Sequence, residues 1–195
     1  MTKRRPAAIP LRARALPAQS RPGGTSEGGR SPPPSSPDSR AMDAIPASVA
    51  GFIAEGRVGR LGTADASGQP LVVPICYAFD GHSLFSAIDA KPKTTSPQRL
   101  KRIRNIRENA KVSVVIDRYD EDWAQLRYVI IQGRAQILTD GGDFSRGADL
   151  LLAKYPQYRA MGLSREAGLM IKVDPARVTR WQFAPPDGHA SPGEA

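Results

Sequence analysis

Short segments in which apolar and polar residues alternate dominate the chain from Val58 onward, and this period of two constrains the fold most strongly. Alternation places apolar side chains on one face of a strand, as in a sheet that covers a core on one side. The pattern predicts these strands: 58–64, 71–79, 83–88, 111–119, 127–138, 169–173 and 178–183. Turn-forming residues at 65–68 and 80–81 favour direct antiparallel connections between the first strands.

Three segments show helical spacing of apolar residues instead, near 47–56, 97–109 and 143–155. Ser48 is a candidate N-cap for the first helix, and Ser96 followed by Pro97 is a typical start for the second. About six short antiparallel strands with a few helices predict a mostly β, α+β fold. We expect an antiparallel split β-barrel with about three flanking helices.

The net charge of +9 is concentrated near the N-terminus. Residues 1–40 contain eight lysines and arginines, two acids and eight of the 18 prolines, with no helical or strand period. We therefore expect residues 1–41 to form a disordered basic tail, or translation to begin at Met42 instead. The folded domain is then 42–184, followed by a flexible tail over 185–195. Nucleic-acid binding is expected, if anywhere, only through the basic tail.

Composition excludes several classes of protein. One cysteine rules out an intramolecular disulfide, and two histidines rule out a multi-histidine metal site. No apolar run approaches the ~18 residues of a membrane helix. The expectation is a cytoplasmic protein with no membrane segment and no metal site.

Isolated residues with reactive side chains have ordinary explanations. Cys76 lies among apolar residues and is expected to be a packed thiol, and His82 is expected to be exposed in a turn, although a lone haem ligand is an alternative. Four acids close together fit a solvated turn better than a metal site: Asp117, Asp120, Glu121 and Asp122.

Two lysines before a predicted helix form the best candidate for an anion site. Lys91 and Lys93 lie just ahead of Ser96, where the free N–H groups of a helix would add to the lysine charge and bind a phosphate. The helix continues with five arginines and lysines between positions 99 and 107. The same residues also fit two exposed turn lysines and a solvated basic face, and their spacing leaves both interpretations open.

An ordered series of motifs carries a family resemblance. It comprises Val58-Gly-Arg-Leu-Gly-Thr-Ala64, Asp65-Ala-Ser-Gly-Gln-Pro-Leu-Val-Val-Pro74, Phe79-Asp-Gly81, Lys91-Pro-Lys93 and Asn105-Ile-Arg-Glu-Asn109. Over roughly residues 47–183 the chain resembles the pyridoxamine-phosphate-oxidase-like split β-barrels, and more narrowly the branch that binds the deazaflavin coenzyme F420. The stretches 117–123 and 154–158 are similar to one subgroup of that branch.

The resemblance implies a homodimer with two cofactor sites at the subunit interface. By position, Lys93 matches the lysine that binds the cofactor phosphate, Lys91 matches a basic or small polar neighbour, and Thr94 would add a hydroxyl contact. Two strand segments match those along the cofactor ring: Val73, Pro74, Ile75, Ala87, Ile88 and Asp89. Trp123 would lie near the ring or the substrate, or else cover the barrel end.

The implied activity is hydride transfer between coenzyme F420 and a small electron-poor organic substrate. The cofactor carries such a reaction, so no catalytic side chain is assigned. FMN is the alternative cofactor, and a non-catalytic flavin-binding or haem-binding protein is the alternative function. Because no lysine or arginine lies between Leu71 and Phe79, oxidation of the vitamin itself is not expected.

Overall fold

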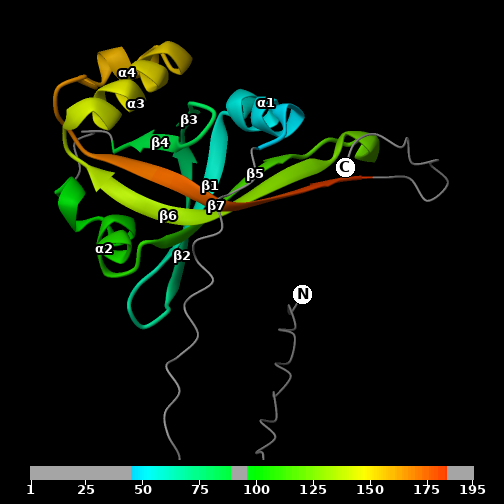
Figure 1. Cartoon of the computed structure of the whole chain (residues 1–195), viewed down its shortest axis with the longest axis horizontal. Helices are drawn as coiled ribbons and strands as arrows, with labels where there is room; N and C mark the ends of the chain where they lie inside the picture. Colours follow the sequence, from blue (N-terminus) through cyan, green and yellow to red (C-terminus); the bar gives the residue numbers. More distant parts are fainter. Residues whose placement is uncertain (1–44, 89–95, 184–195) are drawn as a thin grey trace, which may run out of the picture. The chain divides into compact units, whose positions relative to one another are not determined.

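The computed structural model describes residues 45–88 and 96–183, which form seven strands and several helices (Figure 1). The predicted tails and the segment 89–95 lie outside the described residues. In chain order the elements are α1 Ala47–Glu55, β1 Val58–Ala64, β2 Pro70–Cys76, β3 Ala78–Phe79, β4 Leu84–Ala87, the 3₁₀ turn η1 Pro97–Arg99, α2 Lys101–Glu108, β5 Lys111–Arg118, the 3₁₀ turn η2 Trp123–Gln125, β6 Arg127–Leu138, α3 Gly141–Lys154, α4 Gln157–Ala160 and β7 Met170–Gln182.

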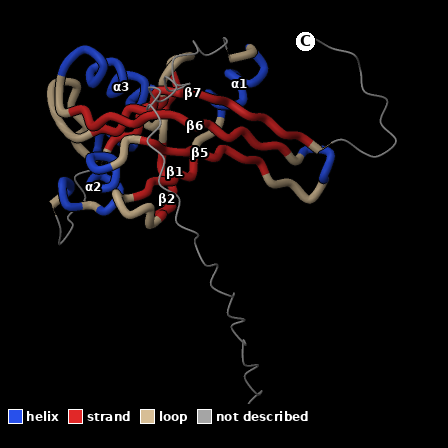
Figure 2. The backbone as a smooth tube through the Cα atoms, turned by 60° about the horizontal axis from the view of Figure 1, so that its bottom comes forward, coloured by secondary structure: helices blue, strands red, loops and turns tan. Residues whose placement is uncertain are grey.

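All seven described strands form one antiparallel sheet in the order β2-β1-β5-β6-β7-β4-β3. Its two edge strands, β2 and β3, are separated in the chain only by Tyr77. The sheet therefore curls until β2 contacts β4, and it forms the wall of a half-barrel (Figure 2). This confirms the predicted split-barrel, mostly β fold.

The predicted strand 71–79 is wrong as a single element. Tyr77 is fully buried, and its hydroxyl donates to the Ile53 carbonyl oxygen at 2.6 Å. Anchored in this way, the chain crosses from one edge of the sheet to the other, and β2 and β3 become separate strands. Pro74 lies on an edge strand, where its missing N–H is tolerated, as the sequence suggests.

The predicted C-terminal strands 169–173 and 178–183 are one strand, β7. The pairing of β6 with β7 shifts register between Gln132 and Gly133. Pro175 of β7 lies opposite Gly133 at this shift. Pairing of β7 with β4 ends at Val173, so Pro175 removes no hydrogen bond on that side. The bulge preserves one long strand where the sequence pattern breaks.

Two helix predictions need correction, whereas the first and third helices occur close to their predicted ranges. Ser48 is not an N-cap, because α1 begins at Ala47 after Pro46. The predicted helix 97–109 divides into η1 and α2, since Leu100 has extended backbone torsions. Ser96 does precede η1, but its side chain forms no capping hydrogen bond. The elements η2 and α4 were not predicted.

The core has two parts. The larger lies among α1, α2 and the sheet, and its fully buried members include Ile53, Leu61, Ile103, Val114 and Ile131. The smaller lies between α3 and the β3–β4 hairpin, with Phe85, Phe144, Leu151 and Met170 at its centre. None of the helices in the described ranges is long and apolar enough to cross a membrane.

Candidate functional site

The strand segments expected along a cofactor ring lie next to each other where the half-barrel closes. β2, which carries Val73, Pro74 and Ile75, contacts β4, which ends at Ala87. Ile75 is buried, Val73 packs partly against the core, and Pro74 is exposed. A flat ligand here would therefore meet backbone and small apolar groups, with no charged side chain from these three residues.

The chain leaves this corner at Ile88, which is buried and whose N–H donates to the Leu169 carbonyl oxygen at 2.8 Å. The residues expected to hold the phosphate follow directly in sequence. Four expected site residues, Asp89, Lys91, Lys93 and Thr94, lie outside the described part of the chain.

The basic surface of α2 is partly neutralised. The Lys101 ammonium donates to the Asp65 carboxylate at 2.7 Å, and this bond, with hydrogen bonds from Ser67 and Gln69, holds the pKa of Asp65 well below its usual range. Arg104 is exposed and forms no ion pair with described residues. The helix thus offers fewer free cations than its sequence suggests.

Asn105, the first residue of the Asn105–Asn109 motif, supports the fold. It is completely buried, and its amide nitrogen donates to the Thr63 hydroxyl at 3.1 Å, which fastens α2 to β1. This bond accounts for Asn105 as a packing residue, so the motif it belongs to supports the fold at this point.

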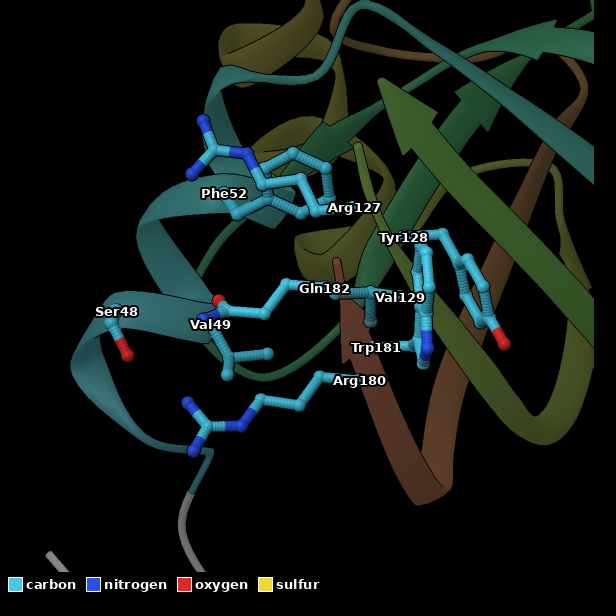
Figure 3. Close-up of a pocket in the computed structure, with 9 residues that line it drawn as sticks. All are labelled: Ser48, Val49, Phe52, Arg127, Tyr128, Val129, Arg180, Trp181 and Gln182. Atoms are coloured by element: carbon cyan, nitrogen blue, oxygen red, sulfur yellow. The ribbon is translucent and has the colours of Figure 1, made fainter. Parts of the chain in front are cut away.

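A hollow of about 380 Å³ lies between α1 and the adjoining ends of β6 and β7 (Figure 3). Its lining residues are Ser48, Val49, Phe52, Arg127, Tyr128, Val129, Arg180, Trp181 and Gln182. The Arg127 guanidinium carbon lies 4.7 Å from the centre of the Phe52 ring. Tyr128 and Trp181 stack on each other with ring centres 5.3 Å apart. The hollow thus combines an apolar helix surface with two arginines.

Sequence reasoning missed this hollow. The available signal was an arginine followed by an aromatic residue in each of two strands, Arg127-Tyr128 and Arg180-Trp181. Their juxtaposition depends on the register that pairs Tyr128 with Trp181, which the sequence pattern does not provide.

A second hollow, of about 480 Å³, lies beside α4 and the start of β1, where Arg57, Cys76 and Tyr155 are among the residues that line it. Cys76 is exposed, so its expected role as a packed thiol is wrong. Its side chain alternates with that of buried Ile75 and points away from the core.

Next to this second hollow, Lys154 reaches the C-terminal end of α1. Its ammonium donates to the Ala54 and Gly56 carbonyl oxygens at 2.7 and 2.6 Å and lies 4.5 Å from the centre of the Tyr77 ring. Burial, with a smaller contribution from Arg57, lowers the pKa of Lys154 to about 8. Burial also raises the pKa of Tyr77.

The remaining candidates are surface residues. His82 is exposed in the β3–β4 turn, as expected. Trp123 has an exposed fraction of 60%, lines neither hollow, and meets Phe183 edge to face at 6.5 Å. Among the described residues, no group of three or more histidine, cysteine or acidic side chains could hold a metal ion.

A comparison with models of protein families identifies the family of the chain. A family model described as pyridoxamine 5'-phosphate oxidase matches residues 45–182, which span the whole sheet. The chain belongs to this family. A comparison with curated protein sequences finds no significant match.

Solved structures of low sequence identity share the family fold. A conserved hypothetical protein of Mycobacterium tuberculosis, Rv2991, has a TM-score of 0.54 and 23% identity, covering 73% of this chain and 86% of that one. HutZ, the heme storage protein of Vibrio cholerae, has a TM-score of 0.55 and 18% identity, covering 72% and 95%. A putative pyridoxamine 5'-phosphate oxidase of Listeria innocua has a TM-score of 0.50 and 18% identity, covering 68% and 94%. At these identities the likeness concerns the fold alone.

Proposed function

We propose that the chain is an oxidoreductase that binds a flavin-type cofactor, specifically the deazaflavin coenzyme F420, and reduces or oxidises a small electron-poor organic substrate. The family match over residues 45–182 carries the flavin-type oxidoreductase, and the choice of F420 rests on the motif resemblance alone. When bound, the coenzyme would supply two-electron hydride transfer, and the protein would supply orientation, a dry surface and anion binding.

The residues along β2 and β4 fit a flat ring. Pro74 is exposed on an edge strand, Val73 and Ile75 turn toward the core, and Ala87 ends the neighbouring strand. Their backbone would orient the ring, while Ile88 would exclude water from its buried edge. We propose Lys93 as the phosphate ligand, with Lys91, Thr94 and Asp89 beside it, since these residues follow directly after Ile88.

A homodimer with its cofactor sites at the interface is part of the proposal. Apolar side chains lie exposed on the outer face of the sheet: Val58, Val72 and Trp181 have exposed fractions of 46%, 65% and 44%. A second copy of the chain that covered this face would remove that apolar surface from water.

A fluorescence titration of the full chain with coenzyme F420 and with FMN in parallel tests the cofactor. We expect tighter binding of F420, and we expect Lys93→Ala to weaken it by about tenfold, as for the loss of a charge-assisted phosphate contact. Lys111→Ala is the matched control, because Lys111 is an exposed lysine at the start of β5.

Tighter binding of FMN than of F420 would mean that the cofactor is FMN, and the proposed cofactor site would stay the same. An equal loss in the Lys93 and Lys111 variants would refute the phosphate assignment. If neither cofactor bound, the oxidoreductase proposal would be wrong, and titration with haem would then test the haem-binding alternative.

A further inference from the structure

The hollow of Figure 3 lies on the inner face of the sheet, where α1 covers the ends of β6 and β7. Buried Val49 and Val129 and half-buried Phe52 form its apolar floor. Ser48 and Gln182 add a hydroxyl and an amide. A volume of about 380 Å³ lies within the range of small-molecule sites, in which a few polar groups orient a ligand on apolar walls.

Two arginines face this floor from neighbouring strands. In the β6–β7 register Arg127 pairs with Gln182, and Val129 pairs with Arg180. Arg127 and Arg180 are therefore diagonal neighbours on one face of the sheet, on either side of Gln182 (Figure 3), and their side chains are long enough to turn toward one bound group. Figure 3 shows both extending toward the α1 side of the hollow, away from the stacked Tyr128 and Trp181 rings.

No acid balances these two charges. None of the nine lining residues is acidic, and neither arginine forms an ion pair with a residue in the described ranges. Elsewhere in the fold several arginines do pair with aspartates: Arg60 with Asp117, Arg118 with Asp120, Arg146 with Asp80 and Asp143, and Arg165 with Asp149. Two like charges that share a hollow without a counter-charge favour an anion between them.

The guanidinium group selects the kind of anion. Its planar set of donors matches the two oxygens of a carboxylate, and Arg127 already lies over an aromatic ring, as arginine does beside flat apolar surfaces. An inorganic anion would use the arginines but leave the half-buried Phe52 ring in contact with water. A ligand with a carboxylate on a flat apolar body contacts both the arginines and the apolar floor of the hollow.

We propose that this hollow binds a small organic carboxylate with a flat apolar body, with the carboxylate held by Arg127 and Arg180 and the body on Phe52. The site shares no residue with the proposed cofactor set. Its test therefore does not depend on a bound cofactor.

Isothermal titration calorimetry of the full chain with 2-naphthoate and with the neutral 2-naphthalenemethanol tests the proposal. The two probes share the same apolar body, so their difference isolates the charge. We expect one naphthoate per chain, bound at least tenfold more tightly than the alcohol. Arg180→Gln and Arg127→Gln should each weaken naphthoate binding by about fivefold or more, and the double variant should remove the preference for the acid.

Arg177→Gln is the matched control, because Arg177 is an exposed arginine of the same strand, and it alternates with Val178, which packs against the core. This variant should bind naphthoate as the unchanged chain does. The proposal is overturned if Arg177→Gln weakens binding as much as Arg180→Gln, if the acid and the alcohol bind equally, or if naphthoate does not bind. Each single variant substitutes one exposed side chain, so the test stands even if the double variant does not fold.

Discussion

Helix α1 meets basic side chains at both ends, and the two ends engage them differently. At its C-terminal end the Lys154 ammonium donates to two backbone carbonyls, and Arg57 donates in turn to the Lys154 carbonyl oxygen at 2.8 Å. At the other end Arg180 lies beside the first turn without any carboxylate, and Arg127 lies over Phe52 in the next turn, also without one among the described residues (Figure 3). The last carbonyls of a helix are free acceptors, whereas its first turn presents N–H donors, so only the C-terminal end satisfies a cation.

The two groups of cations therefore differ in role: one stabilises the fold, and the other is free of carboxylate partners in the described part of the chain and can bind a ligand. The cations at the C-terminal end belong to a partly buried hydrogen-bond network that joins the end of α1 to α3, whereas Arg127 and Arg180 have no carboxylate partner among the described residues. Substitution at the C-terminal end should therefore reduce stability, and substitution beside the first turn should reduce ligand binding instead. The following predictions test this division.

Tyr155→Phe should have the largest effect, a loss of about 2 kcal/mol in the free energy of unfolding. The Tyr155 hydroxyl lies 2.6 Å from the Arg57 carbonyl oxygen and 2.9 Å from that of Tyr77, and its removal leaves buried backbone groups without a partner. Urea unfolding followed by circular dichroism measures the change.

The matched control for this prediction is Tyr128→Phe. The Tyr128 side chain is half-buried, and its hydroxyl forms no hydrogen bond with a described residue. Its substitution should change the free energy of unfolding by less than about 0.5 kcal/mol. Equal losses in the two variants would contradict the division between the two ends of α1.

The pH dependence of the free energy of unfolding should report the protonation of Lys154. Its pKa is lowered to about 8 in the folded chain, from an unfolded value of 10.5. Between those two values the unfolded chain holds a proton that the folded chain has released, so the free energy of unfolding should rise with pH through this window. Above pH 10 the raised pKa of Tyr77 acts in the opposite direction, because the unfolded chain then loses its phenolic proton first.

Urea midpoints at pH 7, 8, 9 and 9.5 for the unchanged chain and for Lys154→Met measure this effect. The variant lacks the titrating group, so the difference between the two proteins should grow in favour of the unchanged chain as pH rises. A difference that stays constant over this range would mean that Lys154 titrates alike in both states.

Alternation of residues is sufficient to predict β1 and β6 to the residue, because in both strands every second side chain faces the core. It fails at Tyr77, where the apolar alternation continues while a long-range hydrogen bond redirects the chain. It also fails at Pro175, where a bulge in β7 itself lets one strand continue past the proline. Both failures depend on contacts between residues far apart in sequence.

The same limit applies to the two candidate sites. The residues of the β2–β4 corner could be named in advance only through the family resemblance, and their role along a cofactor stays a prediction. The arginine hollow could not be anticipated, because Arg127 and Arg180 come together only through the register of β6 and β7. A single-residue shift in that register would place the two arginines on opposite faces of the sheet.

Arg180→Met should have the smallest effect on stability, a change within about 0.5 kcal/mol. Its side chain is exposed and has no ion-pair partner among the described residues, so its replacement leaves no buried group unpaired. Because the change also removes one of two neighbouring like charges, the variant should gain slightly in low salt, and that gain should fade as salt screens the charges. Urea midpoints at 20 mM and 500 mM sodium chloride measure both effects. A loss of 2 kcal/mol or more would mean that Arg180 is structural in the same sense as Tyr155, and would erase the distinction between the two ends of α1.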